Sequence, residues 1–124
     1  MMSNRPMIVA IALALLAGSP AFAADPANGA KLFKAKCSVC HSTEAGQNKI
    51  GPSLFGIVGR PTGSVAGYNY SPANKAAGLT WDLATLDKYL VDPRAMVPGT
   101  KMTFPGLKVD GERADVIAYL ATLK

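Results

Sequence analysis

Apolar residues in this chain recur at helical spacing, and no two segments show the alternation of a paired β-strand. Val116, Ile117, Leu120 and Leu123 form a stripe at spacings of three and four residues, which places them on one face of a helix. Asp110 precedes the stripe and is a suitable residue to open the helix. The sequence therefore predicts a C-terminal helix with one buried face.

Capping residues followed by proline mark where other helices begin. Asp, Ser or Thr can accept a hydrogen bond from the free N–H groups of a first turn, and proline fits that turn because it has no N–H. These signals predict three helices. The first runs from Asp25-Pro26 through about Lys36, with Gly29, Leu32, Phe33 and Lys36 on one face, and a short second one runs from Ser71-Pro72 to near Gly78. The third is Trp81–Val91, capped by Thr80 and stopped by Pro93.

Two long segments between these helices carry no periodic pattern. Glu44–Gly67 contains six glycines and two prolines, and Val97–Gly106 contains two of each. Long loops are unusual in a compact domain unless something binds them. The pattern therefore predicts an all-α fold of short helices and long loops wrapped around a core that is not protein.

The N-terminal segment has the layout of a secretory signal peptide. Arg5 is followed by the uninterrupted apolar run Ile8–Ala17, and Ala21-Phe22-Ala23 supplies the small residues of a cleavage site. We expect cleavage between Ala23 and Ala24, export to the periplasm, and a single mature domain over residues 24–124. An uncleaved anchor stays open as the less favoured alternative, because the apolar run has ten residues where a spanning helix needs about 20.

Charge and cysteine content narrow the classes of function. The whole chain has a net charge of +5, which becomes +4 once Arg5 is removed, and acidic and basic residues alternate without a basic run. This pattern argues against nucleic-acid binding and favours a positive docking face for an acidic protein. A disulfide between Cys37 and Cys40, the only two cysteines, would close a loop of four residues and restrain little.

Both cysteines and the only histidine lie together in Cys37-Ser38-Val39-Cys40-His41. This C-x-x-C-H order is typical of c-type haem attachment. Each thiol can add to a haem vinyl group to form a thioether, and His41 then stands under the iron as its proximal ligand. The sequence therefore predicts one covalent haem c, held by Cys37 and Cys40.

Other interpretations of these residues fit less well. A thioredoxin-like C-x-x-C belongs near a βαβ unit, whereas this motif follows a predicted helix. A structural zinc site needs four ligands, and the chain offers only three Cys or His residues, all adjacent. A simple disulfide beside an unrelated histidine remains as the plainest alternative.

The second axial position of the iron has two candidate residues. No second histidine exists, and Met96 and Met102 are the only methionines after the predicted cleavage site. A methionine opposite histidine is typical of electron-transfer cytochromes. Met102 lies in the loop Pro98–Gly106, which can carry a side chain across the haem, whereas Met96 follows Pro93 on an expected short helical turn that faces elsewhere.

From Gly29 to about Leu123 the sequence resembles class I cytochrome c, of the mitochondrial type that includes the short bacterial cytochrome c2 group. The matching pieces are Cys37–His41, Gly51-Pro52, Gly59-Arg60, Gly67-Tyr68-Asn69-Tyr70, Ala73-Asn74-Lys75, Trp81, Tyr89-Leu90, Pro98–Phe104 and Ile117–Leu120. The resemblance implies the cytochrome c fold. It also favours Met102 as the second axial ligand.

The resemblance implies further roles for residues around the haem. By this likeness, the Pro52 carbonyl accepts a hydrogen bond from His41, and a buried haem propionate is surrounded by Arg60, Tyr70 and Trp81. The likeness also implies a polar group near Met102, formed by Asn74, Tyr89 and Thr100. The first and last helices are expected to cross at Gly29, Phe33, Val116 and Tyr119. Departures from the family include a His41–Gly51 loop one residue shorter than in the animal proteins, Pro61 and Arg94.

The function implied is that of a soluble, monomeric, periplasmic one-electron carrier rather than an enzyme. Its expected partners are membrane complexes: a quinol–cytochrome c reductase, and a terminal oxidase or photosynthetic reaction centre. The lysines that match the family's docking ring are Lys36, Lys49, Lys101 and Lys108. Two alternatives stay open: a peroxidase-like or gas-binding haem with a free sixth position, and a haem subunit docked permanently in a larger enzyme.

Overall fold

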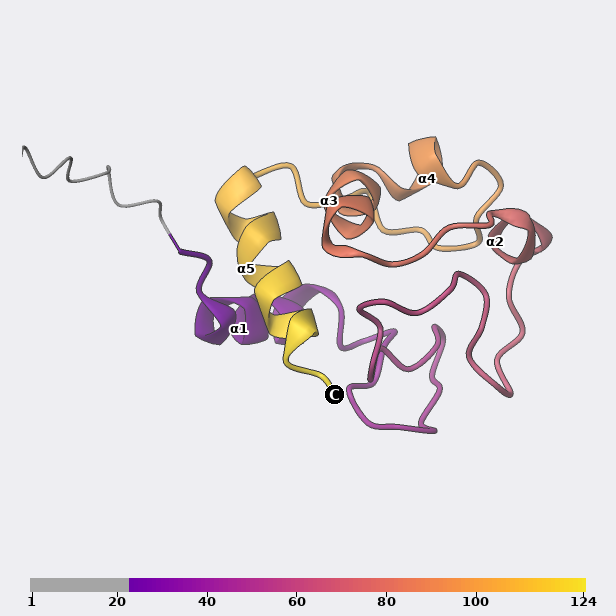
Figure 1. Cartoon of the computed structure of the whole chain (residues 1–124), viewed down its shortest axis with the longest axis horizontal. Helices are drawn as coiled ribbons and strands as arrows, with labels where there is room; N and C mark the ends of the chain where they lie inside the picture. The colour runs from indigo at the N-terminus through magenta and orange to yellow at the C-terminus, as the bar shows by residue number, and fades with distance from the viewer. Residues whose placement is uncertain (1–22) are drawn as a thin grey trace, which may run out of the picture.

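The computed structural model describes residues 23–124, in which five helices are joined by irregular segments, the longest of them between α1 and α2 (Figure 1). The helices are α1 (Pro26–Lys36), α2 (Pro72–Ala76), α3 (Leu83–Val91), α4 (Pro93–Met96) and α5 (Asp110–Ala121). The described residues contain no strand, only an isolated bridge between Pro61 and Thr80. The predicted all-α class with long loops is confirmed.

The predicted signal peptide, residues 1–23, lies outside the described residues except for Ala23. Within residues 23–124, none of the helices has the length and apolar character needed to cross a bilayer.

Helix α1 begins where the capping signal predicts. The Asp25 carboxylate accepts a hydrogen bond from the Ala27 N–H at 2.9 Å, and Pro26 occupies the first turn. The same arrangement opens α2, where the Ser71 hydroxyl accepts from the Asn74 N–H at 3.1 Å. In both cases the side chain satisfies an N–H that the helix itself leaves free.

Helix α3 begins two residues later than predicted. Its cap is Asp82, whose carboxylate accepts from the Thr85 N–H at 2.7 Å, and the prediction of Thr80 as the cap is wrong. The reason is that Trp81 has its backbone paired elsewhere. The Trp81 N–H donates to the Arg60 carbonyl at 2.9 Å, and its carbonyl accepts from the Gly59 N–H at 2.8 Å.

Helices α1 and α5 cross, so that the two ends of the described chain pack together (Figure 1). A Cβ at Gly29 would lie 1.9 Å from the Asp115 carbonyl oxygen, so only glycine allows this approach. The rings of Phe33 and Tyr119 pack with centroids 5.4 Å apart. The crossing expected from the sequence is present.

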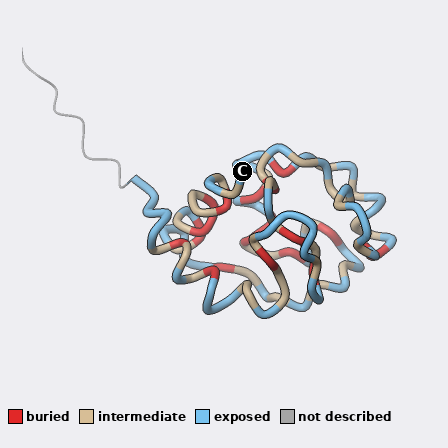
Figure 2. Tube along the Cα trace, turned by 90° about the horizontal axis from the view of Figure 1, so that it is seen from below, coloured by how far each residue is buried: buried red, intermediate tan, exposed pale blue. Residues whose placement is uncertain are grey.

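The buried residues form one apolar cluster between the helices and the loops, and the outer turns of the trace are exposed (Figure 2). The cluster draws on three helices and the segments between them: Phe33 from α1; Ile57 and Trp81 from the connections; Leu86, Tyr89 and Leu90 from α3; Val97 and Leu107 from the segment before α5; and Val116, Ile117 and Leu120 from α5. The residues of the predicted C-terminal stripe supply one wall of this core.

Candidate functional site

A cavity of about 660 Å³ lies beside this cluster, and residues from α1, α3, α5 and both long loops line it. Its walls are mostly apolar, with Ile57, Leu86, Leu90, Val116 and Leu120 among them. Every predicted site residue lines it: Cys37, Cys40, His41, Pro52, Arg60, Tyr70, Asn74, Trp81, Tyr89, Thr100 and Met102. The structure thus brings together residues that are up to 65 positions apart in the sequence.

The two cysteines enter the cavity from the turn that ends α1. The Cys37 N–H donates to the Phe33 carbonyl at 2.8 Å, and the Cys37 carbonyl accepts from the N–H groups of Cys40 at 3.1 Å and His41 at 2.9 Å. Both thiols are free. Burial raises the pKa of the Cys37 thiol to about 11, so it is a neutral thiol at physiological pH.

One hydrogen bond orients the ring of His41. It engages Nδ1 and leaves Nε2 available to bind a metal. Its Nδ1 lies 2.7 Å from the Pro52 carbonyl oxygen, and because a carbonyl only accepts, Nδ1 carries the proton. Burial lowers the pKa of His41, more than the bond to Pro52 raises it. The ring is therefore neutral and has Nε2 free of a proton, as metal ligation requires.

Met102 is held by two polar neighbours. The Tyr89 hydroxyl donates to the Met102 sulfur at 3.1 Å, and the Thr100 hydroxyl oxygen accepts from the Met102 N–H at 3.2 Å. Burial raises the pKa of Tyr89 to about 12, so the phenol keeps its proton and remains a donor. Met96 is on α4, packs against the apolar cluster, and does not line the cavity.

Three further polar residues, Arg60, Tyr70 and Asn74, also line the cavity. Arg60 donates to the carbonyls of Ser53 and Phe55, each at 3.0 Å, and the Tyr70 hydroxyl accepts from the Val65 N–H at 2.9 Å. Burial lowers the pKa of Arg60, although a guanidinium stays charged in any case. The Asn74 Oδ1 atom is buried and has no hydrogen-bond partner from the described residues.

These features fit a haem. The cavity offers two thiols for thioether bonds, a neutral imidazole, a thioether sulfur and apolar walls of the kind that bury a flat macrocycle. The unpaired Asn74 oxygen is a polar group that only a bound molecule or water can satisfy. Among residues 23–124, no three His, Cys, Asp or Glu side chains converge as a protein-only metal site would need.

Sequence reasoning missed Tyr68 as a residue that shapes the cavity. Tyr68 lines it, packs edge-on against Tyr70 with ring centroids 4.8 Å apart, and donates to the Ile50 carbonyl at 2.7 Å. Lys101 lies over the Tyr68 ring at 5.0 Å. The position of Tyr68 two residues before Tyr70 was the available signal, because a pair of this kind can share one face of an extended segment.

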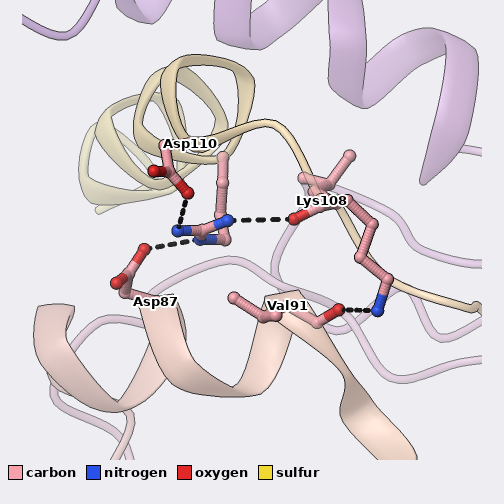
Figure 3. Close-up of polar contacts among 6 residues, drawn as sticks. Asp87, Val91, Lys108 and Asp110 are labelled. Carbon is pink, nitrogen blue, oxygen red and sulfur yellow. Dashed lines mark hydrogen bonds and ion pairs between the residues drawn. The ribbon is translucent and has the colours of Figure 1, made fainter.

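The four lysines of the predicted docking ring are all exposed but differ in place. Lys36 and Lys101 line the cavity. Lys49 donates to the Ser38 carbonyl at 2.9 Å, beside the cysteine turn. Lys108 donates to the Val91 carbonyl at the end of α3 and does not line the cavity (Figure 3).

Comparisons with known proteins agree with this site. The family model described as cytochrome c matches residues 26–124. Cytochrome c2 of Rhodopila globiformis is 51% identical over 100 residues, covering 81% of this chain and 94% of that protein. Cytochrome c2 of Rhodomicrobium vannielii is 50% identical over 117 residues, covering 93% of each. The solved structure of cytochrome cH from Methylobacterium extorquens superposes with a TM-score of 0.74 at 47% identity, covering 79% of this chain and 98% of that one.

A helical fold closed around a cavity that a C-x-x-C-H motif enters defines a c-type haem protein. The match to the family model and the sequence identities near 50% narrow this class of haem proteins to one family. The chain belongs to the class I cytochrome c family. It is an electron carrier and not an enzyme, and Cys37 and Cys40 are its attachment residues for covalent haem c.

Proposed function

We propose that this cytochrome carries single electrons in the periplasm, between membrane complexes of a respiratory or photosynthetic chain, with His41 and Met102 as the two axial ligands of its iron. The mature protein comprises residues 24–124 after removal of a signal peptide over residues 1–23. Support for export comes from the order of charged, apolar and small residues at the N-terminus. Periplasmic attachment of haem to a bacterial protein of this kind is consistent with that order.

The observation that carries the ligand assignment is the pairing of each ligand with its own polar neighbour. His41 is fixed by the Pro52 carbonyl and Met102 by the Tyr89 hydroxyl, and both side chains line one cavity with the two cysteines. A histidine–methionine pair gives the raised potential of an electron-transfer haem. With both positions taken by protein atoms, no substrate position is left on the iron, which disfavours the peroxidase-like and gas-binding alternatives.

Haem c, when bound, supplies one-electron chemistry at an iron that alternates between ferric and ferrous states. The chain's own residues supply the constant surroundings. Pro52 keeps His41 in one tautomer, and Tyr89 and Thr100 keep Met102 in place. The apolar walls exclude water, so the environment reorganises little when the charge changes.

Three polar residues are suited to a haem propionate. Arg60 and Tyr70 line the cavity together, and Trp81 is buried beside them. A carboxylate taken out of water needs donors or a cation, and Arg60 provides the cation while Tyr70 and Trp81 provide O–H and N–H donors. Asn74, with its unpaired oxygen, belongs with Tyr89 and Thr100 in the polar group near Met102.

Docking to partners is assigned to the exposed lysines Lys36, Lys49, Lys101 and Lys108. Positive charges near the haem attract acidic surfaces and raise the rate of encounter in a salt-dependent way. Lys36 and Lys101 carry most of this role, because they stand at the cavity itself. Cytochrome c2 relatives support redox partners in general, and the particular reductase and oxidant are part of the proposal.

The test is the near-red sulfur-to-iron charge-transfer band of the ferric protein, with intact mass measured on the same preparation. We expect the band in the wild type and in Met96→Ala, and its loss in Met102→Ala. The mass should correspond to residues 24–124 plus one haem. A band that survives in Met102→Ala but disappears in Met96→Ala would reverse the ligand choice, and a mass without the tetrapyrrole would contradict the cofactor.

A further inference from the structure

The segment that carries Met102 contains no helix or strand, so besides the contacts of Met102 itself its position depends on how its two ends are held. Val97 and Leu107 mark these ends, and each is only 2% exposed in the apolar cluster. Met102 lies midway, five residues from each. Anything that shifts Leu107 relative to α3 therefore acts on Met102 through a short tether.

Leu107 is held through both of its backbone polar groups. Its N–H donates to the Leu90 carbonyl at the end of α3 at 2.7 Å. Its carbonyl accepts from Arg113 Nη1 on α5 at 3.1 Å, one of the contacts drawn in Figure 3. Tyr89, the residue before Leu90, is the one whose hydroxyl contacts the Met102 sulfur. The end of α3 thus touches the Met102 segment at two places.

Arg113 joins three parts of the molecule. Besides Leu107, its guanidinium donates from Nε to the Asp87 carboxylate on α3 at 2.6 Å and from Nη2 to the Asp110 carboxylate at 2.8 Å (Figure 3). The residue is 7% exposed, and a buried guanidinium is stable only while its donors are paired. Its planar fork matches these three acceptors, which the point charge of a lysine cannot do.

Gly106, the residue before Leu107, packs so closely against the end of α3 that the chain has little room to move there. Its φ of +114° is open to glycine alone, and a Cβ there would lie 2.0 Å from the Val91 carbonyl oxygen. The chain therefore passes directly against the end of α3 just before Leu107. The bond from Arg113 adds a polar restraint from α5 to the packing of Leu107 in the apolar cluster.

We propose that Arg113 is a positioning residue for Met102: through the Leu107 carbonyl and Asp87 it holds the Met102 segment on the end of α3, and so sets how readily the sulfur leaves the iron. This inference rests on the proposed axial role of Met102. Departure of the sulfur breaks one coordinate bond, and an added imidazole forms another with its own electron pair, so no oxidant or reductant takes part.

The experiment titrates ferric holoprotein with imidazole and follows loss of the near-red band, alongside denaturant unfolding of the same samples. In Arg113→Met we expect imidazole to bind about tenfold more tightly than in the wild type, because opening the segment no longer breaks a charge-assisted hydrogen bond. The matched control is Asp115→Ala on the same helix. Asp115 bonds the Asp25 N–H and Asn28 on the α1 side, so its loss should lower global stability and leave imidazole affinity within about twofold of the wild type.

Two further variants test the role of Arg113 even if Arg113→Met does not fold. If Arg113→Met does not fold, Arg113→Lys and Asp87→Asn each weaken one part of the contact, and each should tighten imidazole binding by a smaller factor. Imidazole affinity that follows global stability alike in the Arg113 and Asp115 variants would show that Arg113 is merely structural. If the band proves independent of Met102, the ligand assignment fails and this role fails with it, which the Met102→Ala spectrum reveals separately.

Discussion

At the scale of single residues, the Tyr89 hydroxyl is the group placed to adjust the electronic character of the Met102 sulfur. It donates to that sulfur at 3.1 Å from a buried side chain, and the Trp81 ring packs on it with centroids 4.6 Å apart. A hydrogen bond to a thioether withdraws electron density from it, which weakens the sulfur as a donor to ferric iron. With Met102 as the proposed ligand, the phenol would therefore favour the reduced protein.

Replacement of Tyr89 by phenylalanine removes this donor without leaving a large void. With Met102 as ligand, we expect the reduction potential to fall by an amount on the order of tens of millivolts, the size of one net hydrogen bond. Redox titration measures it. Tyr119→Phe is the matched control, because Tyr119 packs on Phe33 and does not line the cavity. A potential that is the same in both variants would contradict the role of Tyr89.

Residue-level prediction from the sequence succeeded where the chemistry is carried by a rare residue in a local pattern. Cys37, Cys40 and His41 are adjacent, so their motif is visible without a fold. Arg113 was not predicted, because a lone arginine among charged neighbours resembles a solvated side chain. Its spacing was the missed signal: it lies three and four residues before Val116 and Ile117, on the buried stripe of α5.

At the scale of elements, the contact between α1 and α5 depends on one carboxylate as well as on packing. The Asp115 side chain accepts from the Asp25 N–H at 2.7 Å and from the Asn28 amide at 2.8 Å. These two bonds favour the ionised form and lower the pKa of Asp115 below its usual value of 3.8. The carboxylate thus ties the start of α1 to the middle of α5.

The sign of the resulting pH effect follows from this lowered pKa. The stabilisation by Asp115 is fully present above pH 3.8 and is lost as the pH falls through the lower value of the folded state. We expect Asp115→Asn to unfold at a lower temperature than the wild type at pH 7, by a few degrees at most because the site is only partly buried. The difference should narrow below pH 3.8. A difference that stays constant down to pH 2 would contradict the assignment.

The elements were largely predictable because their ends carry strong local signals. Asp25-Pro26 and Ser71-Pro72 mark the starts of α1 and α2 as the structure has them, and the short turn expected after Pro93 is α4. The start of α3 was placed wrongly at Trp81. The competing contact there is with Arg60, 21 residues earlier, and pairing at that distance leaves no local trace in the sequence.

At the scale of the whole molecule, a cavity of about 660 Å³ lies among residues of α1, α3, α5 and both long loops, and its walls are mostly apolar. Removing apolar surface from water stabilises a fold. The haem, when bound, covers these walls and completes the core.

Loss of the attachment sites should consequently affect the entire fold. In the Cys37→Ala/Cys40→Ala double variant we expect most tertiary structure to disappear while part of the helix content remains. Near-ultraviolet circular dichroism measures the loss of tertiary structure, and far-ultraviolet circular dichroism measures the helix content that remains. Tyr119→Phe, which keeps both cysteines, serves as a control for the purification. A cooperative calorimetric transition in the haem-free variant would contradict this expectation.

The crossing of α1 with α5 also sets an order of events during biosynthesis. The attachment motif follows α1 directly, but the helix that packs on α1 is made from the last part of the chain, residues 110–121. A chain that emerges from its N-terminus therefore presents both thiols long before the native closure is possible. With attachment in the periplasm, as proposed, the attaching enzyme can reach the thiols in an open chain, and packing of α5 on α1 then closes the protein around the haem.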